Sequence, residues 1–178
     1  MKKNVLFIIF ILLIGCSDFE PFEGIAITQY ADKVIRFSSQ YTTNSWSAAR
    51  ALGKENVYPD YGDYINAWAS LTDDDQREFL ELGFDTVQTV TKIQIFETYN
   101  PGAVDSVFLR DAGTKKWNLV YAKPAVKGLP EKSRIFEIFL IEETTFFTDA
   151  IRIAINSPAI PNWNEIDAVA ITGQRKKK

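Results

Sequence analysis

The architecture of this chain is clearest in residues 92–102, which read KIQIFETYNPG. Ile93 and Ile95 alternate with Lys92 and Gln94, and a period of two is typical of a strand with one buried face. The letters NPG follow at once, and such a Pro-Gly pair marks a tight turn. The segment therefore predicts a half-buried strand that is closed by a turn.

Runs of the same kind recur along most of the chain. Leu80, Leu82 and Phe84 repeat the alternation, and so do Ile151 and Ile153. The expected strands are approximately 33–39, 65–70, 78–84, 90–97, 104–111, 116–122, 134–142, 149–156 and 165–172. Helix signals are limited to about two turns within 45–52 and one turn that begins at Thr72. Many short strands with few helices predict an all-β fold, an antiparallel β-sandwich of jelly-roll type.

The first sixteen residues predict a secretory signal followed by a lipid attachment site. Lys2 and Lys3 precede an apolar run from Val5 to Ile14, and Cys16 comes directly after a glycine. The apolar run is about half of the ~20 residues that a spanning helix needs. Its end resembles the bacterial lipobox, in which the cysteine thiol receives diacylglycerol. We therefore expect residues 1–15 to be a signal peptide and Cys16 to carry the lipid.

The segments that flank the sandwich are short. We expect residues 16–32 to be an acidic tether, 33–173 the sandwich, and 174–178 a basic tail. Residues 17–20, SDFE, resemble the acidic tetrapeptides that send lipoproteins to the outer surface in one large phylum of Gram-negative bacteria; an ordinary solvated tether is the alternative. The expectation is a monomer, lipid-anchored to the outer membrane of the cell envelope and displayed at its surface.

Composition excludes several functions. The chain has no histidine, which excludes Ser-His-Asp and Cys-His catalysis and histidine-ligated zinc. Loss of Lys2 and Lys3 with the signal changes the net charge from −3 to −5, and an acidic protein is a poor ligand for nucleic acid. Cys16 is the single cysteine, so no intrachain disulfide can form. The residues nominate no catalytic group, and we expect a protein that is not an enzyme.

Four segments together resemble a known family of domains. They are residues 37–41 (FSSQY), 51–63 (ALG, then YP and YGD), 97–104 (ETYNPGAV) and 163–169 (WNEIDAV). Their order and spacing resemble the discoidin-like, or galactose-binding-like, β-sandwich of F-box/leucine-rich-repeat protein N-termini and of pappalysin-type accessory modules. The resemblance covers nearly all of residues 33–173. It implies the sandwich fold strongly and the function weakly, because such sandwiches bind carbohydrate, lipid and protein partners.

The resemblance also implies a metal site. In discoidin-like folds, the loops at one end of the sandwich bind ligand, and a calcium ion often supports them. The candidate calcium ligands are Asp60, Asp63 and Glu165, with Asn66 a weaker candidate. The alternative is structural: Asp63 forms an Asx turn, and Glu165 accepts backbone hydrogen bonds where a strand begins.

Candidate ligand-binding residues lie in the same loops. They are Tyr61, Tyr64, Glu97, Tyr99, Asn100, Trp163 and Asn164. Aromatic rings stack on the apolar faces of sugars, while amide and carboxylate groups bind the hydroxyls. The structural alternatives are that Glu97 accepts backbone hydrogen bonds beside its turn and that loop aromatics, Trp46 among them, seal the ends of the core. Trp68 and Trp117 are expected inside the core.

These observations favour a non-catalytic binding module. Recognition of carbohydrate or glycoconjugate is the first hypothesis, based on the loop aromatics. Attachment to an envelope or secreted protein partner is the alternative, and hydrolase activity ranks far lower because nothing singles out a carboxylate pair.

Overall fold

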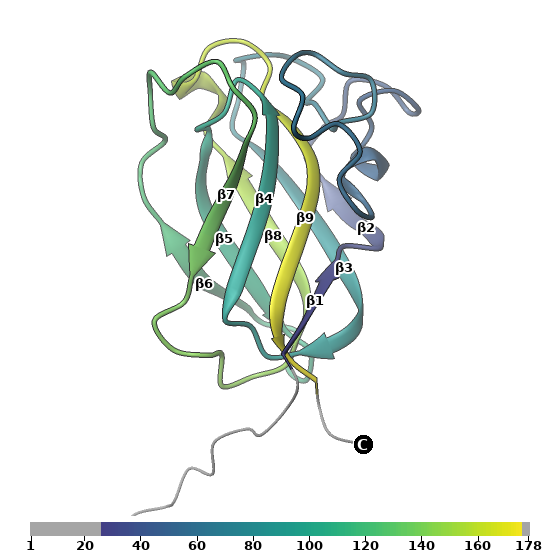
Figure 1. Cartoon of the computed structure of the whole chain (residues 1–178), viewed down its shortest axis with the longest axis vertical. Coiled ribbons are helices and arrows are strands. Elements are labelled where there is room, and N and C mark those ends of the chain that lie inside the picture. Colours follow the sequence, from purple (N-terminus) through teal and green to yellow (C-terminus); the bar gives the residue numbers. More distant parts are fainter. Residues whose placement is uncertain (1–25, 176–178) are drawn as a thin grey trace, which may run out of the picture.

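Alternating apolar residues place two antiparallel sheets face to face in the computed structural model, which describes residues 26–175 (Figure 1). One sheet has the strand order β1-β9-β4-β7 and the other β2-β3-β8-β5-β6. The strands are β1 (Ala26–Tyr30), β2 (Lys33–Phe37), β3 (Glu78–Gln88), β4 (Lys92–Tyr99), β5 (Val104–Asp111), β6 (Trp117–Ala122), β7 (Arg134–Phe139), β8 (Thr148–Ile155) and β9 (Glu165–Gln174). The expected all-β sandwich is confirmed.

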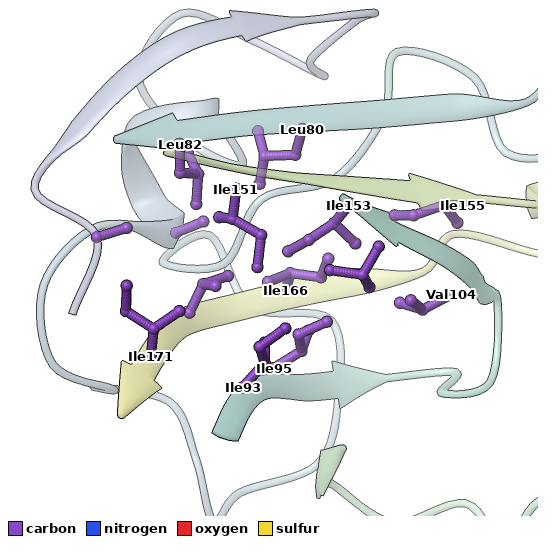
Figure 2. Packing of buried hydrophobic residues seen from close by; sticks show 14 of the residues in the cluster. Leu80, Leu82, Ile93, Ile95, Val104, Ile151, Ile153, Ile155, Ile166 and Ile171 are labelled. Carbon is purple, nitrogen blue, oxygen red and sulfur yellow. The ribbon is translucent and has the colours of Figure 1, made fainter. Parts of the chain in front are cut away.

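The core fills the space between the sheets (Figure 2). Side chains of β3 and β8 meet those of β4 and β9 there; the largest fully buried ones include Leu80, Leu82, Ile93, Ile95, Ile151, Ile153, Ile155, Ile166 and Ile171. Burial of each such side chain stabilises the fold by about 1.5–3 kcal/mol. The alternation in β4 is confirmed, because Ile93 and Ile95 are fully buried while Lys92 and Gln94 remain partly exposed.

Two expectations about strands are wrong. Residues 26–30, assigned to the tether, form β1 and pair with the edge of β9, Ala26 opposite Gln174. The sandwich therefore begins by Ala26, and β9 reaches one residue into the expected tail. Residues 65–70 form no strand; Trp68 makes an isolated bridge to Ile166. Trp68 is fully buried, so apolar character in that segment reflects a loop packed onto the core.

The helical expectations are only partly met. A short 3₁₀ helix, η1 (Ala48–Ala51), replaces the two turns expected within 45–52, and Ser47 precedes it without a side-chain cap. Residues 72–75 are bends. A second 3₁₀ helix, η2 (Ser157–Ala159), lies between β8 and β9. No helix in residues 26–175 is long and apolar enough to cross a membrane.

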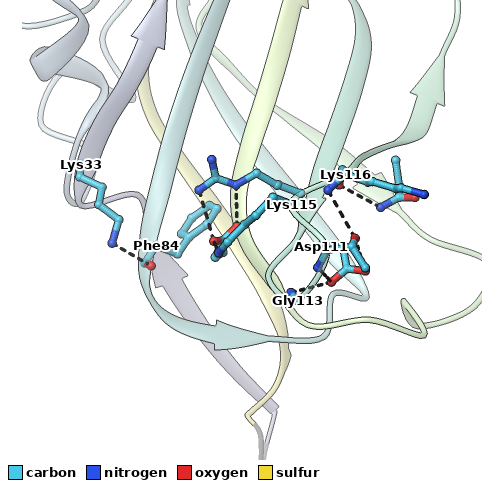
Figure 3. A network of polar contacts seen from close by, with 10 residues as sticks. Lys33, Phe84, Asp111, Gly113, Lys115 and Lys116 are labelled. Atoms are coloured by element: carbon cyan, nitrogen blue, oxygen red, sulfur yellow. Dashed lines mark hydrogen bonds and ion pairs between the residues drawn. The ribbon is translucent and has the colours of Figure 1, made fainter.

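The two ends of the sandwich differ. The connections 38–77, 100–103, 123–133 and 156–164 lie at one end, opposite the end where β1 begins and β9 finishes (Figure 1). At the latter end, the β5–β6 turn is tight: the Asp111 carboxylate accepts the Gly113 N–H at 2.8 Å (Figure 3). Trp117 begins β6 and is half-buried, contrary to expectation, with the Arg152 guanidinium 4.8 Å from its ring centre.

Candidate functional site

A hollow of about 70 Å³ opens at the end of the sandwich that carries the long connections. Its lining residues are Tyr41, Trp46, Asp63, Ala69, Trp163 and Glu165. Four of them come from the connection 38–77, Trp163 precedes β9, and Glu165 is the first residue of β9. The fold thus brings together groups that lie more than a hundred residues apart in the sequence.

The connection 38–77 is fixed to the sandwich by hydrogen bonds. The fully buried carboxylate of Asp167 on β9 accepts the backbone N–H groups of Val57 at 3.0 Å and Tyr58 at 2.9 Å. Trp68 and Ile166 exchange two backbone hydrogen bonds, of 2.8 and 3.1 Å. Hydrogen bonds to a charged acceptor are about twice as strong as neutral ones. The loop is therefore held in one position, as a pre-formed site requires.

Three aromatic rings form the walls of the hollow. The Tyr41 ring lies 5.3 Å from Trp46 at 79° and 5.7 Å from Trp163 at 85°, and both contacts have edge-to-face geometry. The Trp163 indole donates to the carbonyl of Ser70 at 3.2 Å. Trp46 has a positive φ of 49°, uncommon for a bulky residue. Each ring is thus fixed by contacts within the protein.

A pair of acidic side chains lies beside these rings. The indole N–H of Trp46 donates to both, at 2.7 Å to Asp63 Oδ1 and 3.1 Å to Glu165 Oε1. The backbone N–H of Tyr64 donates to Glu165 Oε2 at 3.2 Å. Glu165 is only 1% exposed, and burial, with the adjacent Asp63, raises its pKa to about 9 although the two N–H donors oppose the shift. Glu165 therefore holds its proton at neutral pH.

The hollow can accept hydrogen bonds more readily than it can donate them. Both indole N–H groups are bonded inside the protein, and no lysine or arginine is among the lining residues. What remains for a ligand is the aromatic surface, the carboxyl oxygens and the Tyr41 hydroxyl. Such a lining suits an apolar frame that bears hydrogen-bond donors.

Three of the predicted site residues meet in the hollow: Trp163, Asp63 and Glu165. Tyr61 and Tyr99 pack on each other, with ring centres 5.7 Å apart, outside the lining residues. Tyr64 contributes its backbone N–H to Glu165, while its ring is exposed. The structural alternative for Glu165, acceptance of a backbone hydrogen bond where β9 begins, therefore holds together with its place in the hollow.

Glu97, Asn100 and Asn164 bond to other groups of the protein, as the structural alternative for Glu97 expects. Glu97 is buried, accepts the Gly102 N–H at 2.9 Å and forms an ion pair with Arg134 at 2.5 Å. The Asn100 amide donates to the Pro161 carbonyl at 2.6 Å. Asn164 is buried, and its amide donates to the Asn100 carbonyl at 2.9 Å. Their polar groups are used within the protein because they fix the turns beside β4 and β9.

The acidic residues do not form the expected metal cluster. Asp60 is not among the residues that line the hollow. Its backbone N–H donates to the carbonyl of Val57 at 2.9 Å and closes a turn. In residues 26–175, no group of three or more His, Cys, Asp or Glu side chains is placed to hold a metal ion. Calcium takes about six to eight oxygen ligands. Asp63 and a protonated Glu165 do not supply such a set, so the calcium prediction rests on the sequence alone.

Tyr41 and Trp46 line the hollow but were not among the predicted ligand contacts. Both lie in the 38–77 connection, and Trp46 was recognised only as a loop aromatic. The available signals were an aromatic residue in a predicted loop for Trp46 and, for Tyr41, its place in the family-like segment 37–41. Which loop rings turn toward one another depends on how the loop packs, and no spacing in the sequence encodes that.

A family model described as "Pappalysin-1, SD scarf domain, C-terminal" matches residues 22–178. The F-box/LRR-repeat protein 4 of Bos taurus is 25% identical over 182 residues, which cover 85% of this chain. The chain spans only 29% of the length of that protein.

Solved structures share the fold at low sequence identity. The C-terminal domain of a chitobiase from Bacteroides fragilis has a TM-score of 0.61 and 13% identity, over 82% of this chain and 95% of that domain. The family 32 carbohydrate-binding module of Clostridium perfringens NanJ, solved with galactose, has a TM-score of 0.56 and 13% identity, over 82% and 99% of the two chains. These similarities establish the discoidin-like sandwich architecture.

Proposed function

We propose a binding function from the premise that this chain belongs to the family of the pappalysin-1 SD scarf domain, C-terminal. The chain is a non-catalytic module that recognises carbohydrate or glycoconjugate through the hollow at its loop end. One observation carries this proposal: Tyr41, Trp46 and Trp163 surround the hollow beside two acidic side chains. Aromatic surface with a few fixed polar groups is the usual composition of a sugar site. The galactose complex of the NanJ module, which has the same fold, supports the assignment.

The geometry of the acidic pair supports a role without catalysis. Asp63 and Glu165 share the indole N–H of Trp46 and are close enough to hydrogen bond to each other. The two carboxyl groups of a glycoside hydrolase are separated by about 5–5.5 Å or more, because the sugar or a water must fit between them. Here both carboxyl groups instead accept from one indole N–H that lies between them. The pair acts as an acceptor for a ligand group.

The test is binding to a panel of oligosaccharides, measured by calorimetry on the wild type and two variants. Trp163→Ala removes one wall of the hollow, and we expect at least about a tenfold loss of affinity for whichever glycan binds. Phe139→Ala is the matched control, because Phe139 is an exposed ring at the opposite end of the sandwich, where β7 ends. Its affinity should equal that of the wild type.

Two outcomes would overturn the proposal. A wild type that binds no member of the panel would favour protein attachment, the alternative for a sandwich of this kind. Equal affinity of the Trp163→Ala variant and the wild type would place the glycan site elsewhere on the surface.

We also propose that the module is held on the cell envelope by a lipid at Cys16, a residue that lies outside the described part of the chain. The lipobox-like sequence supports the anchor. Further support comes from the position of Ala26, where β1 begins at the end opposite the hollow (Figure 1). An anchor on that side leaves the hollow facing away from the membrane.

A further inference from the structure

We propose that the hollow binds the primary ammonium group of an amino sugar, with Asp63 and Glu165 accepting its N–H groups and the three rings enclosing it. This inference rests on the proposed carbohydrate function and names the class of sugar. The hollow is lined by carboxyl oxygens and aromatic surface.

Charge is the first reason. No cationic side chain lines the hollow, and the two indole N–H groups are already bonded to Asp63, Glu165 and Ser70. A sugar hydroxyl is neutral and can donate only one hydrogen bond to these acceptors. An ammonium group donates up to three hydrogen bonds and accepts none. Its positive charge strengthens each hydrogen bond that it donates to the acidic side chains.

The aromatic rings supply the second reason. A cation within about 6 Å of a ring centre is attracted to the face of tryptophan or tyrosine, and the attraction grows when water is excluded. Tyr41, Trp46 and Trp163 are mutual neighbours around one hollow, with centre distances of 5.3 and 5.7 Å from Tyr41. A small cation in the hollow is therefore near all three rings.

Size selects the group that enters. The hollow holds about 70 Å³, which is far below the roughly 300–1,000 Å³ of a site that encloses a whole small ligand. One functional group fits, while the sugar ring stays at the mouth. An N-acetyl group is larger and carries no charge. A trimethylammonium group offers no N–H to the carboxyl oxygens, so a primary amine is favoured over a choline head group.

The decisive experiment compares glucosamine oligosaccharides with their N-acetylated counterparts of equal length, at about pH 6, where the free amine is protonated. We expect the wild type to bind the free amine at least about tenfold more tightly. Asp63→Asn should remove this preference. Asp60→Asn is the control, since Asp60 is an exposed acid in the same connection but outside the hollow. Thermal melting confirms that both variants are folded.

Each outcome has a separate meaning. Equal affinity for the two oligosaccharides, or an unchanged preference in Asp63→Asn, would overturn the ammonium site while glycan binding stands. Tighter binding of choline than of glucosamine would overturn the amino-sugar assignment. A wild type that binds no oligosaccharide of any kind would instead overturn the proposed function itself.

Discussion

Glu165 is buried where its negative charge is disfavoured. Water reaches only 1% of the residue, and the adjacent Asp63 repels a second charge. The N–H groups of Trp46 and Tyr64 compensate in part. A buried acid that has no salt-bridge partner usually keeps its proton. The buried acid that we propose as part of a cation site therefore also lowers the folding stability of the unliganded protein as the pH rises.

This gives a pH prediction with a definite sign. The pKa of Glu165 is raised from its ordinary value of 4.5 to about 9 in the folded protein, so between these values the folded state holds one more proton. Stability therefore falls as the pH rises through this window, by up to about 1.4 kcal/mol per pH unit and about 3 kcal/mol in total at pH 7. Glu165→Gln, which cannot ionise, should flatten the dependence and be the more stable protein near pH 8.

Urea unfolding between about pH 5 and pH 9 measures the effect through the unfolding free energy. Asp60→Asn is the control, because it removes a carboxylate of the same connection that does not line the hollow. Its profile should run parallel to that of the wild type. Parallel profiles for Glu165→Gln and the wild type would contradict the prediction.

The residues of the hollow were half predictable from the sequence. Asp63, Trp163 and Glu165 lie in segments that resemble a known family, and the resemblance pointed to them; Tyr41 ends another such segment, 37–41, but was not nominated. Tyr41 and Trp46 enter the hollow because the 38–77 connection folds back on itself. The backbone N–H of Trp46, for example, donates to the carbonyl of Ile65. Such contacts within an irregular loop leave no periodic trace in a sequence.

At the scale of the elements, alternation predicted strands well where one face is buried. β5 runs from Val104 to Asp111, the predicted bounds, because its apolar residues alternate between turn signals on both sides. β1 was missed because it is a five-residue edge strand whose residues remain partly exposed. Residues 65–70 were wrongly predicted as a strand because a loop that packs on the core has the same apolar content as a short strand.

Strand β9 supports a prediction about close packing between backbones. A Cβ added at Gly173 would lie 1.8 Å from the carbonyl oxygen of Thr89, and backbone there cannot move aside easily. Gly173→Ala should therefore destabilise the protein by about 2–4 kcal/mol, through strain between β9 and the connection from β3 to β4. Unfolding in urea measures the change.

Gly83→Ala is the matched control within a strand. The nearest atoms to an added Cβ at Gly83 belong to the flexible side chain of Lys33, which can move. Its effect should stay below about 1 kcal/mol, since alanine also costs less chain entropy than glycine. Equal losses in the two variants would mean that the Thr89 contact is not the cause.

At the scale of the whole molecule, the two ends of the sandwich differ in structure. The hollow lies at the end with the long connections, while β1 begins and β9 finishes at the other (Figure 1). The core is closed at the loop end by residues of the connections, Trp68 and Ile160 among them, while the sheets enclose the rest of it. The proposed lipid anchor would therefore lie at the end opposite the proposed recognition site, and the loss of one should leave the other intact.

That independence predicts the behaviour of a variant without the lipid attachment residue. Cys16→Ser removes the thiol that would be acylated, and two or more acyl chains are what hold a protein stably on a membrane. The variant should take up no labelled fatty acid and leave the membrane fraction, while its glycan affinity should equal that of the wild type because the hollow is at the far end. If Cys16→Ser still bound membranes, another part of the protein surface would have to be the anchor. The exposed residues Phe139 and Ile141, which end and follow β7, would then be the first to replace by serine.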